Sequence, residues 1–520
     1  MNLHLSKRDI LKKTAQFGSF TFLSKILGII REVLIARFFG VGAISDAFIM
    51  SFRIPNFFRQ VFAEGALNAS FIPAFIKTVK EGKREQSNGL MTLSFLAFES
   101  VILLMYVFVF FKTEWVIRLI APGFSQEQIY YAIPFLRILF PFLFFVSSST
   151  LFAGVLQSVN CFAVPAFGPV LWNIVYVGSL ILALYWHLSP NIVCFGIIFG
   201  GFLWMVMNAF FYLKYGFRVG KITSDVVILF RDVLKRFLPC LFGVSIVELN
   251  LFVGTVVASF LPTGSLTLLY LSSRFMNIPL GAFAVALSNI LLSHFSRIVL
   301  YAPRRLNYYI LEVTKLVTWV ILPSVLFLMF VSEPLFSTVL LVKSGNLQQT
   351  TMGAGLLRTY LIGLLFFSMN KILLSVFYSL KDTKSTMIAS SISALVNVGG
   401  DISGMLLFGA YGIAGAASLS GLVMTVACFY FLRKKHKFRF YSGRYFDFLW
   451  RYLAQLLFVI ASFLWGHGLF TLLIKNTYCS HFFINGFGFW VLTGALGALS
   501  MLFLFYTKKM FGIKLHFLDK

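Results

Sequence analysis

The chain is a succession of apolar stretches, each about 20 residues long, which is the length a helix needs to cross a bilayer. Of its 520 residues, 59% are hydrophobic and only 12% are charged. A soluble protein of this length requires far more polar surface, so the sequence predicts an integral membrane protein. The stretches lack the two-residue alternation of membrane β-strands, and we therefore expect α-helices rather than a barrel.

We predict fourteen transmembrane spans, near residues 16–38, 45–76, 88–111, 128–156, 164–186, 191–213, 237–260, 266–296, 309–331, 351–379, 386–408, 411–432, 449–474 and 482–507. Lysine and arginine gather at both ends of the chain and in alternate loops, at 77–84, 214–236, 297–305 and 433–451. The opposite loops hold only Lys112, Arg118, Lys343 and Lys475. By the positive-inside rule, this alternation places both termini in the cytoplasm.

The formal net charge of +26 would suggest a nucleic-acid partner in a soluble protein. Here the basic residues follow the predicted topology, so we expect attraction to anionic membrane lipids and no nucleic acid. The five cysteines match neither a disulfide framework nor a metal-ligand spacing. The phosphate-binding and hydrolase motifs G-x-x-x-x-G-K-[ST], H-E-x-x-H and G-x-S-x-G are absent from the sequence, which therefore predicts no enzyme.

Landmark residues of the first half recur 224 positions later in the second half. The pairs are Gly40 and Gly264, Pro55 and Pro279, Phe71 and Phe295, and Asn173 and Asn397. Six spans per repeat would orient both halves alike, as in carriers whose cargo site lies at the repeat interface. Because the matches are sparse, sequence drift is an alternative to a true repeat.

The repeat predicts four parts of the chain. Residues 1–213 form an N-terminal lobe of spans 1–6, and 237–435 form a C-terminal lobe of spans 7–12. Residues 214–236 are a basic cytoplasmic linker, which we expect to hold an amphipathic surface helix. Residues 436–520 add spans 13 and 14 and a tail, and this helix pair is either a lipid-facing support or part of a lateral groove.

Ionisable residues are concentrated in the first two spans. They are Lys25, Arg31, Glu32 and Arg37 in span 1 and Asp46, Arg53, Arg59 and Glu64 in span 2, with Glu248 in span 7 and Arg274 in span 8. Each charge near the bilayer centre costs about 2.5–3.5 kcal/mol on insertion scales, so these groups must face a cavity or pair with one another. The basic excess suggests an anionic cargo, most simply one bearing phosphate, which arginine grips with two parallel hydrogen bonds. Internal ion pairs, such as Arg31 or Arg59 with Asp46 or Glu64, are the alternative for some of them.

Two of the spans contain equivalent proline breaks. Pro55 interrupts span 2 and Pro279 interrupts span 8, and each removes a backbone donor and bends its helix. The two readings are a gating hinge in each half and a simple packing kink.

The charged spans also carry a family resemblance. The segments S-K-I-L-G-I-I-R-E (24–32), A-R-F-F-G (36–40), D-A-F (46–48) and P-N-F-F-R-Q-V-F-A-E-G-A (55–66) resemble the MurJ/MviN lipid II flippases. Further matches are A-P-G-F (121–124), P-A-F-G-P-V-L-W-N (165–173), G-V-S (243–245), A-S-F-L (258–261) and R-F-M-N-I-P (274–279). The flippases belong to the multidrug/oligosaccharidyl-lipid/polysaccharide exporter superfamily.

The resemblance implies an all-α polytopic protein of about fourteen helices, with two six-helix lobes in a V shape around a cationic cavity. Spans 13 and 14 would form a hydrophobic groove for a polyprenyl tail. The cargo would be lipid II, an undecaprenyl-diphosphate-linked disaccharide-pentapeptide, moved by alternating access from the cytoplasmic to the outer leaflet of the bacterial inner membrane. We expect a monomer. The alternative is an exporter of another lipid-linked oligosaccharide or of a drug within the same superfamily.

The resemblance also assigns residues to the transport site. The positions that match functional residues of the family are Ser24, Arg31, Asp46, Arg59, Glu64 and Arg274, and Arg53 lies among them. Lys25 and Glu32 stand where the family usually has arginine and aspartate, and Asn277 replaces a common acidic residue.

Some family members bind sodium in the second lobe. Asn397 and Asp401 resemble two of those ligands, but the acidic ligand expected in span 7 falls at Gly254. Sodium coupling is therefore an open expectation beside coupling to the membrane potential, and no other cofactor is expected.

Overall fold

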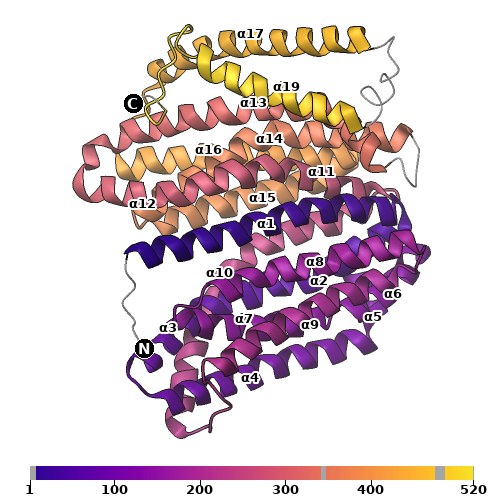
Figure 1. Cartoon of the computed structure of the whole chain (residues 1–520), viewed down its shortest axis with the longest axis vertical. Helices are drawn as coiled ribbons and strands as arrows, with labels where there is room; N and C mark the ends of the chain where they lie inside the picture. The colour runs from indigo at the N-terminus through magenta and orange to yellow at the C-terminus, as the bar shows by residue number, and fades with distance from the viewer. Residues whose placement is uncertain (1–6, 341–346, 475–486, 519–520) are drawn as a thin grey trace. The chain divides into compact units, whose positions relative to one another are not determined.

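In the computed structural model, which describes residues 7–340, 347–474 and 487–518, every regular element is a helix (Figure 1). Among these residues, 11 helices are long and apolar enough to cross a membrane. The predicted all-α membrane architecture is confirmed, whereas the predicted count of fourteen spans is not. The first predicted span, α1 (Lys7–Phe39), carries several charges, and the second is divided into three elements.

The chain packs as two compact units, of which the first comprises Met1–Arg274, Pro334–Leu356 and Asn397–Ala414. Its elements are α1, α2 (Ala43–Phe58), the π-helix η1 (Arg59–Leu67), α3 (Asn68–Lys80), α4 (Arg84–Phe111), α5 (Thr113–Ile120), α6 (Gln126–Leu139), α7 (Phe142–Ser158), α8 (Ala163–Tyr185), α9 (Asn191–Lys214), α10 (Ser224–Ala258) and most of α11 (Ser265–Pro279). Helix α8 packs against both α1 and α9, and the α8–α9 pair runs side by side in Figure 1.

The expected surface helix of the linker is the beginning of α10, which continues without interruption into the seventh predicted span. Residues 215–223 form a loop that is fixed to α4, where Thr92 Oγ1 accepts a hydrogen bond from the Gly220 amide at 3.0 Å. Val226, Phe230, Val233 and Phe237 bury one face of α10 against α3 and α4, while Asp232 and Lys235 stay exposed. This periodic apolar face explains why the linker is helical.

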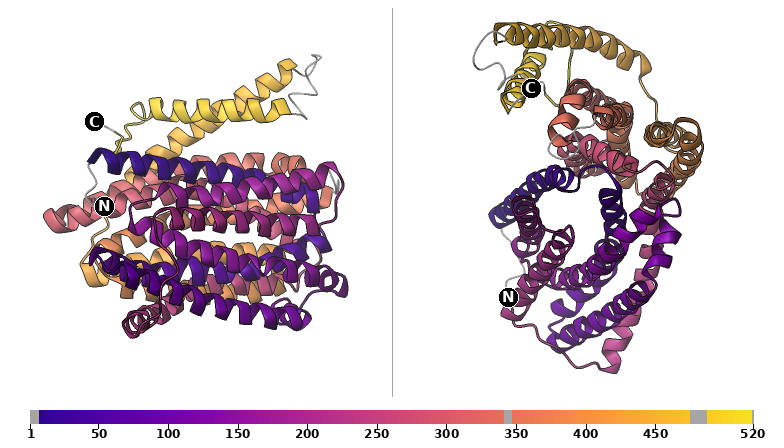
Figure 2. Two further views of the ribbon diagram at one scale, coloured as in Figure 1. Left: turned by 60° about the horizontal axis from the view of Figure 1, so that its bottom comes forward. Right: turned by 90° about the vertical axis from the view of Figure 1, so that its right-hand side faces the viewer.

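The second unit comprises Phe275–Glu333, Leu357–Val396 and Gly415–Lys520. Its elements are the π-helix η2 (Leu280–Ala284), α12 (Val285–Tyr301), the short η3 (Pro303–Arg305), α17 (Ser442–Ile474), α19 (Phe487–Thr507) and most or part of α13 (Leu306–Leu340), α14 (Leu347–Ser379), α15 (Thr383–Phe408) and α16 (Ala410–His436). Helices α17 and α19 pack against each other and are the yellow pair of Figure 2.

Helices α17 and α19 are also attached by buried polar groups. Tyr452 of α17 donates from its hydroxyl to the Trp319 carbonyl of α13 at 2.9 Å. Gln455 donates to the Leu504 carbonyl of α19 at 2.7 Å and to Thr507 Oγ1 at 2.9 Å. The last two predicted spans, which correspond to α17 and α19, are therefore attached to each other and to α13 by buried hydrogen bonds within the second unit.

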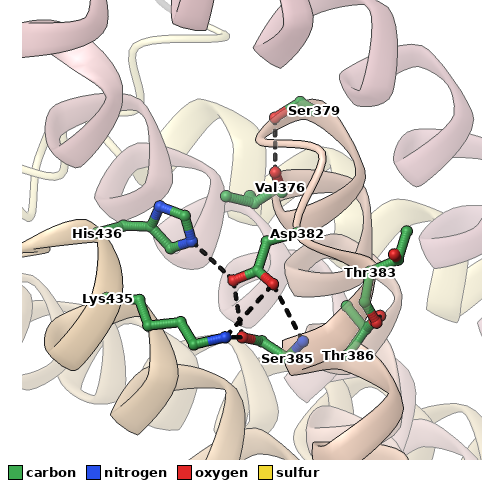
Figure 3. A network of polar contacts seen from close by, with 8 residues as sticks. All are labelled: Val376, Ser379, Asp382, Thr383, Ser385, Thr386, Lys435 and His436. Carbon is green, nitrogen blue, oxygen red and sulfur yellow. Dashed lines mark hydrogen bonds and ion pairs between the residues drawn. The ribbon is translucent and has the colours of Figure 1, made fainter.

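A polar network closes the turn between α14 and α15 (Figure 3). Asp382 caps α15, accepting from the Ser385 amide at 3.1 Å and from the Ser385 hydroxyl at 2.7 Å. His436 Nε2 lies 2.9 Å from Asp382 Oδ2, and Lys435 Nζ lies 3.6 Å from Oδ1. Partial burial opposes ionisation, but the hydrogen bonds from Ser385 and His436 and the Lys435 charge hold the pKa of Asp382 well below its ordinary value.

Both proline breaks lie beside π-helical segments. Pro55 is buried in α2, and η1 begins four residues later at Arg59. Pro279 ends α11 and is followed directly by η2. π-Helical turns are rare and frequently mark functional sites, so the equivalent breaks favour a hinge over a packing kink.

Candidate functional site

The centre of the predicted transport site is the buried carboxylate of Glu32 on α1. Arg31 Nη2 donates to Glu32 Oε1 at 2.7 Å, and only 15% and 8% of the two side chains are exposed. Tyr270 of α11 donates from its hydroxyl to the same oxygen at 3.3 Å. Arg274, one turn further along α11, brings Nε to 3.9 Å from it. Two guanidinium groups therefore share one carboxylate, and this cluster carries an excess positive charge.

The Arg31 guanidinium is held in place from a third helix, α8. Arg31 Nη1 donates to Asn173 Oδ1 at 2.9 Å, and the Asn173 amide donates to Ser24 Oγ at 3.0 Å. The guanidinium carbon also lies 5.2 Å and 5.3 Å from the ring centres of Trp172 and Tyr176, within cation–π range. The predicted site residues Ser24, Arg31, Glu32 and Arg274 thus come together.

Several hydrogen-bonding atoms of this cluster are not used. Arg31 Nε, Glu32 Oε2 and Arg274 Nε are buried without a hydrogen-bond partner in the described part of the chain. The adjoining cavity, lined by Arg31, Tyr176 and Tyr270 among apolar side chains, measures about 20 Å³, enough for one water molecule. In this conformation the cluster is closed around its own carboxylate, and the cavity beside Arg31 is too small for a phosphate group.

Arg59 belongs to a second polar cluster at the start of η1. Arg59 Nε donates to Asn56 Oδ1 at 3.0 Å. When the Gln60 amide is oriented by its neighbours, with its nitrogen toward Glu248 of α10, it donates to both Glu248 oxygens at 2.6 Å and 2.8 Å and accepts from Asn56 at 2.9 Å. This cluster ties the π-helical segment to α10.

Asp46 is buried away from either cluster and is used as a helix anchor. Its carboxylate accepts hydrogen bonds from the Gly264 amide at 2.6 Å and from the Thr267 amide at 2.9 Å, at the start of α11. The Thr267 hydroxyl donates to it at 2.6 Å and the Gln128 amide of α6 at 3.0 Å. All these donors belong to the protein, so Asp46 positions α11, on which Tyr270 and Arg274 lie.

The remaining predicted transport residues are placed as follows. Lys25 is exposed on α1, and Arg53 is half-buried on α2. Glu64 lies within η1, and its side chain falls outside what the structure describes. Asn173, Tyr176 and Tyr270 were not predicted as site residues. Only Asn173 had a sequence signal, because it pairs with Asn397 in the repeat.

The two residues considered for sodium, Asn397 and Asp401, lie next to each other on α15. Asp401 is buried, and the Asn397 side chain turns its nitrogen toward it, with 3.4 Å between Nδ2 and Oδ1. Gly254 does face Asp401, since a β-carbon built there would lie 3.1 Å from Oδ2, but it provides no ligand. One carboxylate with an amide nitrogen is a poor match for a cation that prefers several oxygens.

The second unit contains a large apolar groove. It has a volume of about 600 Å³ and is lined by α13, α17 and α19 together with Ile278 and Pro279. Its walls are formed by apolar side chains such as Phe327, Phe463 and Leu504, with Ser324 and Ser500 as the hydroxyl-bearing residues. A groove of this size and lining suits a hydrocarbon chain.

Comparisons with known proteins point to one family. A family profile described as lipid II flippase MurJ matches residues 35–487. The probable lipid II flippase MurJ of Buchnera aphidicola subsp. Baizongia pistaciae is 32% identical over 398 residues, which are 73% of this chain and 75% of that protein. The corresponding protein of Aquifex aeolicus is 31% identical over 439 residues, 82% of this chain and 84% of its own length. A solved structure of lipid II flippase MurJ in an inward closed conformation aligns with a TM-score of 0.77 and 25% identity, covering 95% of this chain and 99% of that one.

Proposed function

The chain belongs to the lipid II flippase MurJ family, and from this premise we propose that it carries lipid II from the cytoplasmic to the outer leaflet of the bacterial inner membrane. The observation that carries the proposal is the Arg31–Glu32–Arg274 cluster, in which two arginines share one carboxylate. The protein is then a transporter rather than an enzyme, and it works as a monomer with both termini in the cytoplasm.

The diphosphate of the cargo takes the place of Glu32 in this cluster. A diphosphate offers more acceptor oxygens and more negative charge than one carboxylate, so it can engage both guanidinium groups at once. Charge-assisted bonds of this kind are about twice as strong as neutral ones. Asn173 and the aromatic rings of Trp172 and Tyr176 keep the Arg31 guanidinium oriented during the exchange.

The tail of the cargo lies in the apolar groove lined by α13, α17 and α19. This placement keeps the hydrocarbon out of water while the head group moves. Bending at Pro55 and Pro279, beside η1 and η2, supplies the change between the inward and outward states. The membrane-potential energy acting on the basic cluster is about 2.3 kcal/mol per charge per 100 mV.

The test is replacement of the arginines in a strain depleted of its own lipid II flippase, with membrane insertion measured in parallel. Arg31→Ala and Arg274→Ala should each abolish rescue, because a hydrogen bond from a charged group is worth about 1.5–3 kcal/mol. Arg31→Lys keeps the charge but loses the forked geometry, and should rescue only partly.

Full rescue by both alanine variants would refute the proposed role of the cluster. Failure of the unmodified chain to rescue, when it is inserted in the membrane, would instead argue against lipid II as the cargo. In that case purified protein in vesicles, supplied with other lipid-linked oligosaccharides, tests the alternative cargo class.

A further inference from the structure

Glu99 is a buried carboxylate that the proposed transport cluster does not use. It lies in the middle of α4, inside a stretch apolar enough to span the membrane, and only 4% of its surface is exposed. Neither carboxylate oxygen has a hydrogen-bond partner in the described residues. An ionised carboxylate that is buried in a membrane-spanning helix without hydrogen bonds destabilises the folded protein.

The side chains that face Glu99 are the hydroxyls of Ser147 and Ser148. Both belong to α7, which packs against α4, and both are fully buried. Each hydroxyl interacts with the carboxylate but lacks a hydrogen bond of good geometry within the described chain. Four oxygen atoms with unused hydrogen-bonding capacity therefore meet between two helices of the first unit.

The described charged residues do not neutralise this carboxylate. Helix α7 carries no titratable side chain. The titratable groups on the other described elements packed around α4 are Lys77 and Lys80 on α3, Glu114 and Arg118 on α5, Arg59 on η1, and Asp225, Arg231, Asp232, Lys235, Arg236, Cys240 and Glu248 on α10. No ion pair or hydrogen bond joins any of these described groups to Glu99, and the side chains that interact with its carboxylate are those of Ser147 and Ser148.

We propose that Glu99, Ser147 and Ser148 form a buried proton-binding site in the first unit. A protonated carboxyl group has one O–H donor and keeps acceptor capacity, and each serine hydroxyl can both donate and accept. An ionised Glu99 could accept from both serines, but it would stay a buried charge in an apolar helix. A proton removes that charge, and Glu99 then donates to one serine and accepts from the other, so that all four oxygens are still satisfied. A metal cation would need further ligands, and no group of three or more acidic, histidine or cysteine side chains occurs in the described residues.

The site is tested on the purified full-length protein by infrared spectroscopy of its carboxyl groups. At neutral pH the unmodified protein should show a protonated-carboxyl carbonyl band that shifts in heavy water and disappears on raising the pH. This band should be missing from Glu99→Gln. It should remain in Glu114→Gln, a matched change at an exposed carboxylate paired with Arg118.

Ser148→Ala is a second variant, which keeps the proposal testable if Glu99→Gln fails to fold. It retains Glu99 but removes one hydrogen-bond partner, so the band should persist at a shifted frequency. Absence of the band from the unmodified protein at neutral pH, or its persistence in Glu99→Gln, would overturn the proposal. So would a band that appears only when sodium is replaced by a larger cation, because the native occupant would then be sodium. These outcomes do not depend on which cargo the protein carries.

Discussion

At the scale of single residues, two buried carboxylates on neighbouring helices have different tasks because their donors differ. Asp46 receives hydrogen bonds from fixed groups, including the backbone amides of Gly264 and Thr267. Glu32 receives them only from side chains, Arg31 and Tyr270, and the Arg274 guanidinium lies 3.9 Å away, so another anion can take its place without disturbing the backbone. We therefore assign Asp46 to positioning and Glu32 to exchange with the cargo.

Asp46→Asn should destabilise the protein without abolishing its affinity for a diphosphate. The amide offers one acceptor oxygen in place of two and directs an NH₂ group toward backbone donors. The expected loss is about 1.5–3 kcal/mol, measured by thermal unfolding in detergent. Glu114→Gln, which breaks an exposed ion pair, should cost less than about 1 kcal/mol. An equal effect of the two changes would contradict the anchoring role of Asp46.

At the scale of helices, the proline breaks are the features that we expect to move. Pro55→Ala and Pro279→Ala each return a backbone donor to the helix and should make the π-helical segments less favourable. We expect flipping in vesicles to slow about tenfold for each variant, equivalent to about 1.4 kcal/mol in the barrier, with stability unchanged or higher. Pro169→Ala in α8, a helix that continues without a π-helical segment, is the matched control. If Pro169→Ala slowed flipping while Pro55→Ala and Pro279→Ala did not, the result would contradict a role for bending at the two π-helical segments. It would indicate that helix packing sets the rate.

The turn between α14 and α15 should respond to acid through Asp382. Its carboxyl has a depressed pKa in the folded protein, so its stabilising contribution is present above the unfolded pKa of about 3.9 and is lost as the pH falls below it. Asp382→Asn should lower stability by about 1 kcal/mol at neutral pH, because the network is partly exposed. The difference from the unmodified protein should shrink in acid. A difference that is constant with pH would show that the charge is not what matters.

At the scale of the whole molecule, we expect the membrane potential rather than sodium to drive transport. Because Gly254 provides no side chain beside Asp401, we expect Asp401→Asn to be nearly silent. Flipping in vesicles should not change when sodium is replaced by potassium, and should fall when the membrane potential is collapsed at constant pH. Sodium dependence that is lost in Asp401→Asn would reverse this expectation.

The membrane class, the helical fold and the charged residues of the first spans follow from the sequence alone. Apolar length and basic-loop alternation are local properties, and the cost of burying charge marks Arg31, Glu32 and Arg274 wherever they pack. The prolines were equally visible, since their backbone effect is intrinsic to the residue.

Only the tertiary structure decided which partner each of these charged residues binds. Two arginines 243 positions apart in the chain share Glu32, whereas Asp46 binds the start of another helix and Arg59 joins a different cluster. The partners Asn173, Tyr176 and Tyr270, and the pairing of Glu99 with serines of α7, come from helices distant in sequence. Helical periodicity tells which residues share a face, but the choice of neighbouring face is made by packing between helices, which no local pattern encodes.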